Sequence, residues 1–159
     1  MNPNDKKQLL APLMDRLLND SKTASYARPQ AVIAQIRESV RRDLESLFNS
    51  RSCNRSPSRK YPHLQKSLLN FGLPDLSTIN FSSKDDRKRF CSQVETAIKH
   101  YEPRVKSAKV CIGDKVDVED PTIRFRVEAV LHVSPADETI IFDSAFNPIS
   151  HSVDISEIS

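Results

Sequence analysis

The feature that most constrains the fold is the stretch from Ile98 to Val105, where the period of the hydrophobic residues changes at Pro103. Before this proline, apolar residues recur at helical spacing; after it, they alternate as they do in strands. Proline lacks a backbone N–H and disfavours helical backbone in the residue before it, so a helix should end at or just before Glu102. If the backbone from Glu102 to Arg104 is extended, its two ionic side chains project to the same face.

This helix-to-strand corner has two interpretations. Tyr101, Glu102, Pro103 and Arg104 combine a hydrogen-bond acceptor and a donor on stiffened backbone, an arrangement suited to recognising another protein. The alternative is a structural ion pair between Glu102 and Arg104 that pins the corner. Taken by itself, the corner is more simply explained by the ion pair.

Two helices are predicted before the corner. The first runs from Pro29 to Asn49, and the second begins after a cap at Ser82 or Ser83 and continues to the corner. The apolar stripe of the first helix consists of Val32, Ile33, Ile36, Val40, Leu44, Leu47 and Phe48, and that of the second consists of Phe90, Cys91, Val94, Ala97, Ile98 and Tyr101. Each stripe should bury one face of its helix.

After the corner, alternating residues predict a small antiparallel sheet. The expected strands are residues 108–112, 123–133, 139–143 and 149–155. With the helices packed on one face of this mainly antiparallel sheet, the fold class is α+β. The last strands, which include Ile140, Phe142 and Asp143, are short, acidic and C-terminal. We therefore expect them to form an exposed edge that can accept a strand from another protein.

The segment between the two helices, residues 61–76, predicts a short helical turn followed by a compact loop. Asn70, Gly72, Pro74 and Asp75 read as a helix end and a turn, in which Gly72 is free to take a positive φ. This loop either connects the helices or lines a binding surface.

The N-terminal part is a separate prediction. Residues 6–19 carry an apolar stripe of Leu9, Leu10, Leu13, Met14, Leu17 and Leu18, typical of an amphipathic helix. The polar stretch that follows it detaches residues 1–28 as a helical extension, which either docks on a partner or packs on its own domain. Residues 29–159 are expected to form one domain.

Charge is unevenly distributed along the chain. Residues 1–126 hold all 24 Lys and Arg with 15 of the 21 Asp and Glu, so they carry +9, whereas the six acids of residues 127–159 give −6. This asymmetry suggests two different binding surfaces. The three cysteines are widely spaced, and no signal peptide or membrane span is recognisable, which predicts a cytoplasmic protein without membrane insertion.

Motifs for catalysis or cofactor binding are absent from the sequence, so no catalytic residue, cofactor or metal is expected. An alternative is a peptidoglycan-cleaving, lysozyme-like enzyme that uses Glu102. However, Arg104 beside it favours the ionised carboxylate, which is the wrong direction for a general acid. A second alternative is a nucleic-acid-binding module whose basic loop carries Arg51, Arg55, Arg59 and Lys60, but this loop lacks the aromatic residues on which bases stack.

Three blocks resemble one known family. Residues 37–51 resemble its motif R-x-S-[VI]-x-R-D-L-x-x-L-L-N-T-R, residues 61–76 resemble Y-P-x-L-x-x-S-[VL]-L-N-[YF]-G-L-P-D-L, and residues 101–105 match [FY]-E-P-R-[LV]. Phe48 and Ser50 replace the usual Leu and Thr. The family is TssE, the baseplate wedge subunit of the bacterial type VI secretion system, which is similar to a baseplate wedge protein of contractile phage tails.

This resemblance implies a cytoplasmic, non-catalytic assembly protein with an α+β fold, present in six copies in a baseplate. It implies contacts with the wedge proteins TssF, TssG and TssK, made through Glu102 and Arg104 with Pro103 holding them in register. It also implies that the strands after Asp137 initiate polymerisation of the contractile sheath, built from TssB and TssC, by strand exchange. Some members of the family have carried a lysozyme label.

Overall fold

The computed structural model describes residues 17, 29–53, 58, 60–65, 67–113, 122–133 and 137–158. Within these ranges the helical elements are α2 (Pro29–Asn49), α3 (Pro62–Gln65), the 3-10 turns η2 (Leu68–Asn70) and η3 (Leu76–Thr78), and α4 (Lys84–Tyr101). The strands are β1 (Val105–Ile112), β2 (Ile123–Leu131), β3 (Glu138–Asn147) and β4 (Ser152–Ile158). The predicted α+β class is confirmed.

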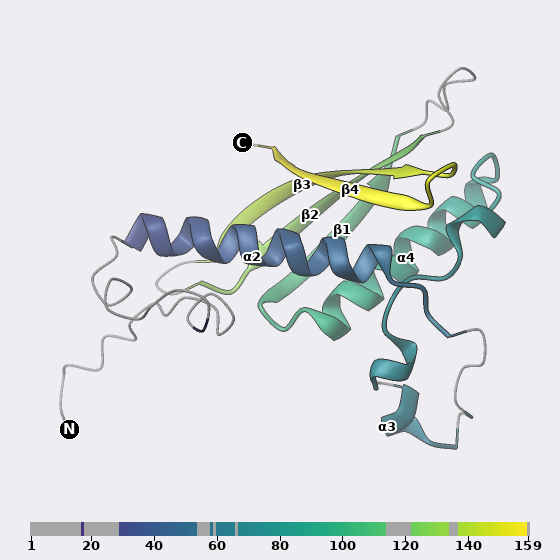
Figure 1. The fold of residues 1–159 in the computed structure, drawn as a ribbon, viewed down its shortest axis with the longest axis horizontal. Helices are drawn as coiled ribbons and strands as arrows, with labels where there is room; N and C mark the ends of the chain where they lie inside the picture. The colour runs from purple at the N-terminus through teal and green to yellow at the C-terminus, as the bar shows by residue number, and fades with distance from the viewer. Residues whose placement is uncertain are drawn as a thin grey trace.

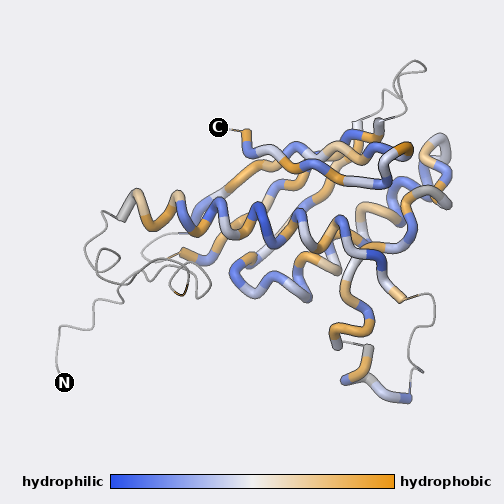
Figure 2. The backbone as a smooth tube through the Cα atoms, viewed as in Figure 1, coloured by the Kyte–Doolittle hydropathy of each residue, from blue (hydrophilic) through white to orange (hydrophobic). Residues whose placement is uncertain are grey.

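The four strands form one antiparallel sheet in the order β1-β2-β3-β4, the meander that the alternating pattern predicts. Helices α2 and α4 cover the same face of the sheet, with α2 over β4 and α4 against β1 (Figure 1). Apolar and polar residues alternate along the strands, as Figure 2 shows, so that one face of the sheet packs against the helices.

Aromatic rings from α2, α4 and β2 pack together in the core. The ring of Phe125 on β2 lies 5.7 Å from that of Phe48 on α2 and 5.5 Å from that of Phe90 on α4, measured between centroids. All three are buried, together with Val127 and Phe142 at the centre of the sheet. The two helices are thereby fixed relative to the same strands, which sets the position of the corner between α4 and β1.

Helix α4 begins and ends where the sequence predicts. Ser83 is its N-cap and accepts a hydrogen bond from the backbone N–H of Asp86, and the helix ends at Tyr101. The corner itself is a turn, not the extended segment considered above. The N–H of Glu102 still donates to Ile98 O at 2.8 Å, and the N–H of Val105 donates to Glu102 O at 3.1 Å. This turn reverses the chain, so that β1 packs against the helix it follows.

Ile140, Phe142 and Asp143 are predicted to lie on an edge strand, but the strand that carries them, β3, is interior to the sheet. β3 pairs with β2 on one side and β4 on the other, and Ile140 and Phe142 are buried in the core. The C-terminal edge of the sheet is β4, which starts at Ser152, three residues later than predicted.

The turn before β4 explains this shift. The Asn147 side-chain oxygen accepts hydrogen bonds from the N–H groups of Ile149 and Ser150, and His151 adopts a φ of 54°. Residues 148–151 are therefore used to reverse the chain and are unavailable for pairing.

The predicted helix at residues 6–19 lies outside the described residues, apart from Leu17. The division between residues 1–28 and 29–159 thus stays a prediction. In the part of the chain that the structure describes, no helix is long and apolar enough to cross a membrane.

Candidate functional site

The corner after α4 is built on a buried ion pair. Arg104 Nε donates to Glu102 Oε1 at 2.7 Å and Arg104 Nη2 donates to Glu102 Oε2 at 2.6 Å, while the backbone N–H of Arg104 also donates to Oε1 at 3.2 Å. The Glu102 side chain is only 5% exposed. Two parallel N–H···O bonds fix both the distance and the plane of the pair, so the turn and the ion pair hold each other.

Arg104 also connects the corner to α2. Its Nη1 donates to Ser39 Oγ at 3.0 Å, and its Nη2 forms an ion pair with Asp43. Ser39 and Asp43 are four residues apart and therefore lie on the same side of the helix. Glu102 first, and then Asp43, raise the pKa of the Arg104 guanidinium above its ordinary value, although burial acts in the opposite direction. The charge of this side chain is thus committed to contacts within the protein.

Tyr101 attaches the preceding loop to the corner. Its hydroxyl donates to Ser67 O at 3.2 Å, and its ring meets Phe71 edge-on with centroids 5.1 Å apart. Burial raises the pKa of the Tyr101 hydroxyl above its ordinary value. The loop of residues 61–76 therefore contacts the corner, through Ser67 and Phe71.

Gly72 positions this loop against the end of α2, in the conformation the sequence predicts. Its φ is +110°, and a Cβ atom at this position would lie 2.3 Å from Ser50 O. The close approach allows a short parallel bridge in which Leu73 N–H donates to Ser50 O and Ser52 N–H donates to Leu73 O, both at 2.9 Å. Without a glycine here the loop could not take this position.

The other predicted loop residues have more local positions. Asn70 is the last residue of η2, and Pro74 and Asp75 follow the bridge before η3 begins. Asp75 lies 3.7 Å from the Arg51 guanidinium, and its backbone carbonyl accepts a hydrogen bond from the Thr78 hydroxyl at 2.7 Å. These residues shape the loop around its bridge to α2.

A groove of about 390 Å³ lies between the corner, α2 and the loop. It is lined by Asp43, Leu44, Ser46, Leu47, Phe71, Tyr101, Glu102, Pro103 and Arg104. Pro103 is exposed, and the Asp43 side chain is 58% exposed, whereas Glu102 lies at the base. The groove thus offers a partner the apolar side chains of Leu44, Leu47 and Phe71, with an acidic group and a proline ring at its rim.

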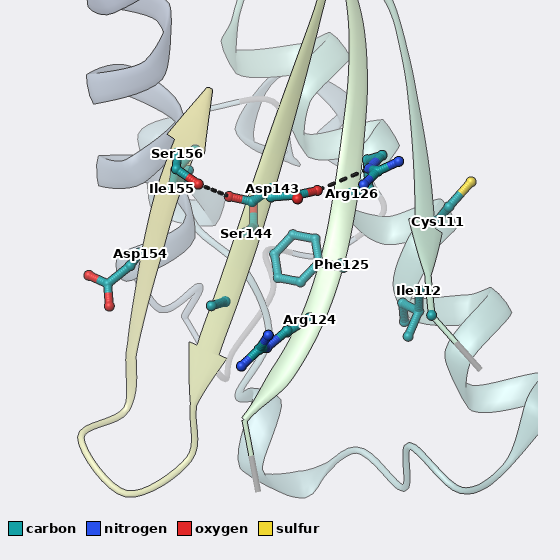
Figure 3. A pocket seen from close by; sticks show the side chains of 12 residues that line it. Cys111, Ile112, Arg124, Phe125, Arg126, Asp143, Ser144, Asp154, Ile155 and Ser156 are labelled. Carbon is teal, nitrogen blue, oxygen red and sulfur yellow. Dashed lines mark hydrogen bonds and ion pairs between the residues drawn. The ribbon is translucent and has the colours of Figure 1, made fainter. Parts of the chain in front are cut away.

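A larger hollow of about 750 Å³ lies on the opposite, helix-free face of the sheet. Figure 3 shows that its polar residues come from neighbouring strands, with Arg126 facing Asp143 and Asp154 on β4 pointing away from both. Arg126 Nε donates to Asp143 Oδ1 at 3.0 Å. Asp143 therefore lies on a different face from the corner, and the hollow is a pleated strand surface bridged by an exposed ion pair.

The family of baseplate wedge protein gp25 matches residues 34–136, well over half of the chain. The chain belongs to this wedge family. It is also similar to anti-adapter protein IraD of Salmonella choleraesuis (strain SC-B67), with 33% identity over 94 residues that cover 59% of this chain and 68% of the relative. For IraD of Salmonella arizonae the identity is 32% over 98 residues, covering 62% and 71%.

In this wedge-family chain, the three sequence blocks named above meet at the corner. Ser39 and Asp43 come from the first block, Ser67 and Phe71 from the second, and the Glu102–Arg104 pair from the third. Ser39 and Asp43 were missed as site residues. Their signal was the four-residue spacing of two polar residues beside the apolar stripe of the first helix, but such spacing does not reveal the partner.

Among the described residues, no cluster of three or more His, Cys, Asp or Glu could hold a metal ion. Both oxygens of Glu102 accept hydrogen bonds from Arg104, so this carboxylate is engaged within the corner. The arrangement is therefore suited to shaping a binding surface. Of the basic loop, Arg55 and Arg59 lie outside the described residues.

Proposed function

We propose that this chain is a non-catalytic, cytoplasmic wedge subunit of the TssE type in a type VI secretion baseplate. In this proposal the groove at the corner docks on the wedge proteins TssF, TssG and TssK, and the edge of the sheet initiates polymerisation of the TssB–TssC sheath by strand exchange, with six copies in each baseplate. Membership of the baseplate wedge family supports the structural role. The convergence of the three blocks on one groove supports the choice of the docking site.

The docking surface in this proposal differs from the ion pair itself. Glu102 and most of Arg104 are held inside the protein, so a partner would meet the exposed Pro103, Asp43 and Ser46 around the groove. Glu102 and Arg104 then act by fixing the turn that presents Pro103. This assignment combines the two interpretations of the corner: the ion pair is structural, and what it holds in place is the binding surface.

A test should fill the groove and leave the ion pair intact. Ser46 is exposed on α2 and lines the groove, so the bulky side chain of Ser46→Trp occupies the space of the partner. We expect this variant to lose co-purification with TssF and TssG while its melting temperature stays within about 2 °C, because an exposed helix position tolerates substitution. Normal co-purification of the Ser46→Trp variant would contradict the assignment of the groove.

A matched control is available on α4. Ser92 is likewise an exposed helix serine, and its carbonyl accepts the hydroxyl of Thr96 four residues later, as the carbonyl of Ser46 accepts that of Ser50. It does not line the groove, so Ser92→Trp should keep the wedge proteins bound. Both variants are to be compared by affinity capture from the native cell, followed by mass spectrometry.

A second candidate function rests on the similarity to anti-adapter protein IraD. A chain of that kind would bind an adapter protein in a simple complex and would not enter a ring-shaped assembly. The same capture experiment separates the two candidates. Recovery of sheath and baseplate proteins supports the wedge role, and recovery of an adapter protein in their place supports the second candidate.

A further inference from the structure

The edge strand β4 directs part of its backbone away from the sheet. In antiparallel pairing, the N–H and C=O of one residue point to the same side, and this side alternates along the strand. Val153 and Ile155 point theirs outward on β4, as the bonds of α2 to both residues show. Outward-pointing N–H and C=O groups of an edge strand are normally a template with which another strand can pair.

Asn49, the last residue of α2, already occupies this template at Val153. Its side-chain Nδ2 donates to Val153 O at 2.9 Å, and its Oδ1 accepts from Val153 N–H at 2.8 Å. A carboxamide carries the same donor and acceptor as a peptide group. Asn49 thus makes with β4 the pair of hydrogen bonds that one residue of a fifth strand would make.

Arg41 forms a hydrogen bond with the next outward-pointing residue of β4, Ile155. Its Nη1 donates to Ile155 O at 3.3 Å. The guanidinium is also held on its own helix by Glu38, at 2.7 and 2.8 Å, and by Glu45, at 2.8 Å. Since Arg41 keeps these two acidic partners, its bond to Ile155 can be given up without leaving the charge unpaired.

The opposite edge of the sheet is closed in a different way. On β1 the N–H of the buried Val110 donates to Glu95 Oε1, on α4, at 2.8 Å. A bond to a carboxylate is roughly twice as strong as one between neutral groups. Glu95 is also half-buried, whereas Asn49 is exposed and neutral. The bonds that close β4 are therefore the easier ones to displace.

We propose that β4 is the edge that receives a partner's extended segment, and that Asn49 occupies the position of this segment until it arrives. Asp154 is exposed on the outer face of β4, within a C-terminal region of net negative charge, so the segment should carry a basic side chain opposite Asp154. This inference rests on the proposed function, because it specifies where strand exchange occurs and which residue controls it.

The test uses a capped seven-residue peptide of alternating valine and lysine as the probe, with the full-length chain. In Asn49→Ala the template at Val153 is vacant, so the peptide should bind at least about fivefold more tightly than it binds the native chain, the factor that corresponds to about 1 kcal/mol of hydrogen bonding no longer displaced. The same peptide N-methylated at alternate residues cannot donate to the edge and should show no gain. Fluorescence anisotropy of the labelled peptides measures both affinities.

Two further variants keep the result interpretable. Arg41→Met frees only Ile155 O and should give a smaller gain in affinity. Because Asn49 is unchanged in this variant, the gain can be measured even if Asn49→Ala fails to fold. Asn80→Ala removes a comparable amide–backbone bond, from Ser82 N–H to Asn80 Oδ1 at 3.1 Å. This bond lies in the turn before α4 and not on β4, so the variant should give no gain in affinity. Amide hydrogen exchange at Val153 should be faster in Asn49→Ala than in Asn80→Ala.

Equal or weaker peptide binding by both Asn49→Ala and Arg41→Met would overturn the inference, since Asn49 would then be only a structural cap. A gain that persists with the N-methylated peptide would overturn it too, because backbone pairing would not be the cause. The proposed function fails by a separate observation, the absence of sheath proteins captured by the native chain.

Discussion

Arg104 and Ser39 are 65 positions apart in the sequence, yet Arg104 Nη1 donates to Ser39 Oγ at 3.0 Å. Ser39 is buried within α2, and Arg104 belongs to the turn that follows α4. Together with the ion pair between Arg104 and Asp43, this bond joins the middle of α2 to the turn that follows α4. It shows that the ionic corner is built into the core, and that the groove beside it is a consequence of how the core is packed.

Replacing the arginine of this corner should be strongly destabilising. In Arg104→Met the Glu102 carboxylate, 5% exposed, keeps its burial and loses the opposite charge. Breaking a buried pair on one side typically costs about 3–5 kcal/mol of unfolding free energy, and we expect a loss toward the lower end because Arg104 is partly exposed. Urea unfolding followed by circular dichroism measures this free energy.

Arg89→Met is the control for this loss. Arg89 is 72% exposed and lies 3.7 Å from Asp86, an exposed pair worth less than about 1 kcal/mol. The double variant Glu102→Gln with Arg104→Met should recover part of the loss, because no charge is then left buried. A cost for Arg104→Met no larger than that of Arg89→Met would mean that the ion pair does not hold the corner.

Two buried serines should respond in opposite directions to alanine. Ser39→Ala removes an acceptor from Arg104 and should lower the unfolding free energy by about 1–2 kcal/mol. Ser144 is also buried, on β3, but its hydroxyl has no hydrogen-bond partner among the described residues. Ser144→Ala should be neutral or stabilising by up to about 1 kcal/mol, because a polar group is no longer buried without a partner. Equal losses for both variants would show that the Arg104–Ser39 bond adds nothing to stability.

The sequence predicts the element types, and both ends of α4, well in this chain because these depend on local chemistry. Pro103 ends α4, Ser83 begins it, and Gly72 takes the positive φ that its turn requires, each for a reason contained within a few residues. The alternation that predicts the strands is equally local. Such signals say which face of an element is buried, and so they lead to the fold class.

What the sequence could not supply is the partner of each polar side chain. Ser39, Asp43 and Asn49 are ordinary polar residues of a helix until α2 is placed against the corner and β4. The edge of the sheet was misassigned for the same reason. A last strand is predicted after Asn147, but only the register of β4 against β3 shows that Phe142 is interior and that β4 alone forms this edge.

Gly72→Ala should destabilise the loop under the corner by at least about 2 kcal/mol. The φ of +110° is strained for any other residue, and the added Cβ would lie 2.3 Å from the backbone oxygen of Ser50. Gly113→Ala is the matched control, since a Cβ there meets nothing within 4 Å, and its effect should stay within about 0.5 kcal/mol. Thermal unfolding of both variants checks this, and similar melting temperatures would contradict the close approach at Gly72.

Tyr101 should make stability depend on pH at alkaline values. Burial raises the pKa of its hydroxyl in the folded state, whereas in the unfolded chain the hydroxyl titrates at about 10. The unfolded state therefore loses this proton first, so the contribution of Tyr101 to stability is complete below about pH 10 and disappears as the pH rises through the folded pKa.

Tyr101→Phe should lower the unfolding free energy at neutral pH by about 1 kcal/mol, through the lost bond to Ser67 O, and should flatten the fall of this free energy above about pH 10. Urea unfolding across this pH range, with the difference in phenolate absorbance between the two proteins, measures both effects. Parallel curves for the two proteins would mean that Tyr101 titrates alike in the folded and unfolded chains, and coincident curves would mean in addition that its hydroxyl does not hold the loop to the corner.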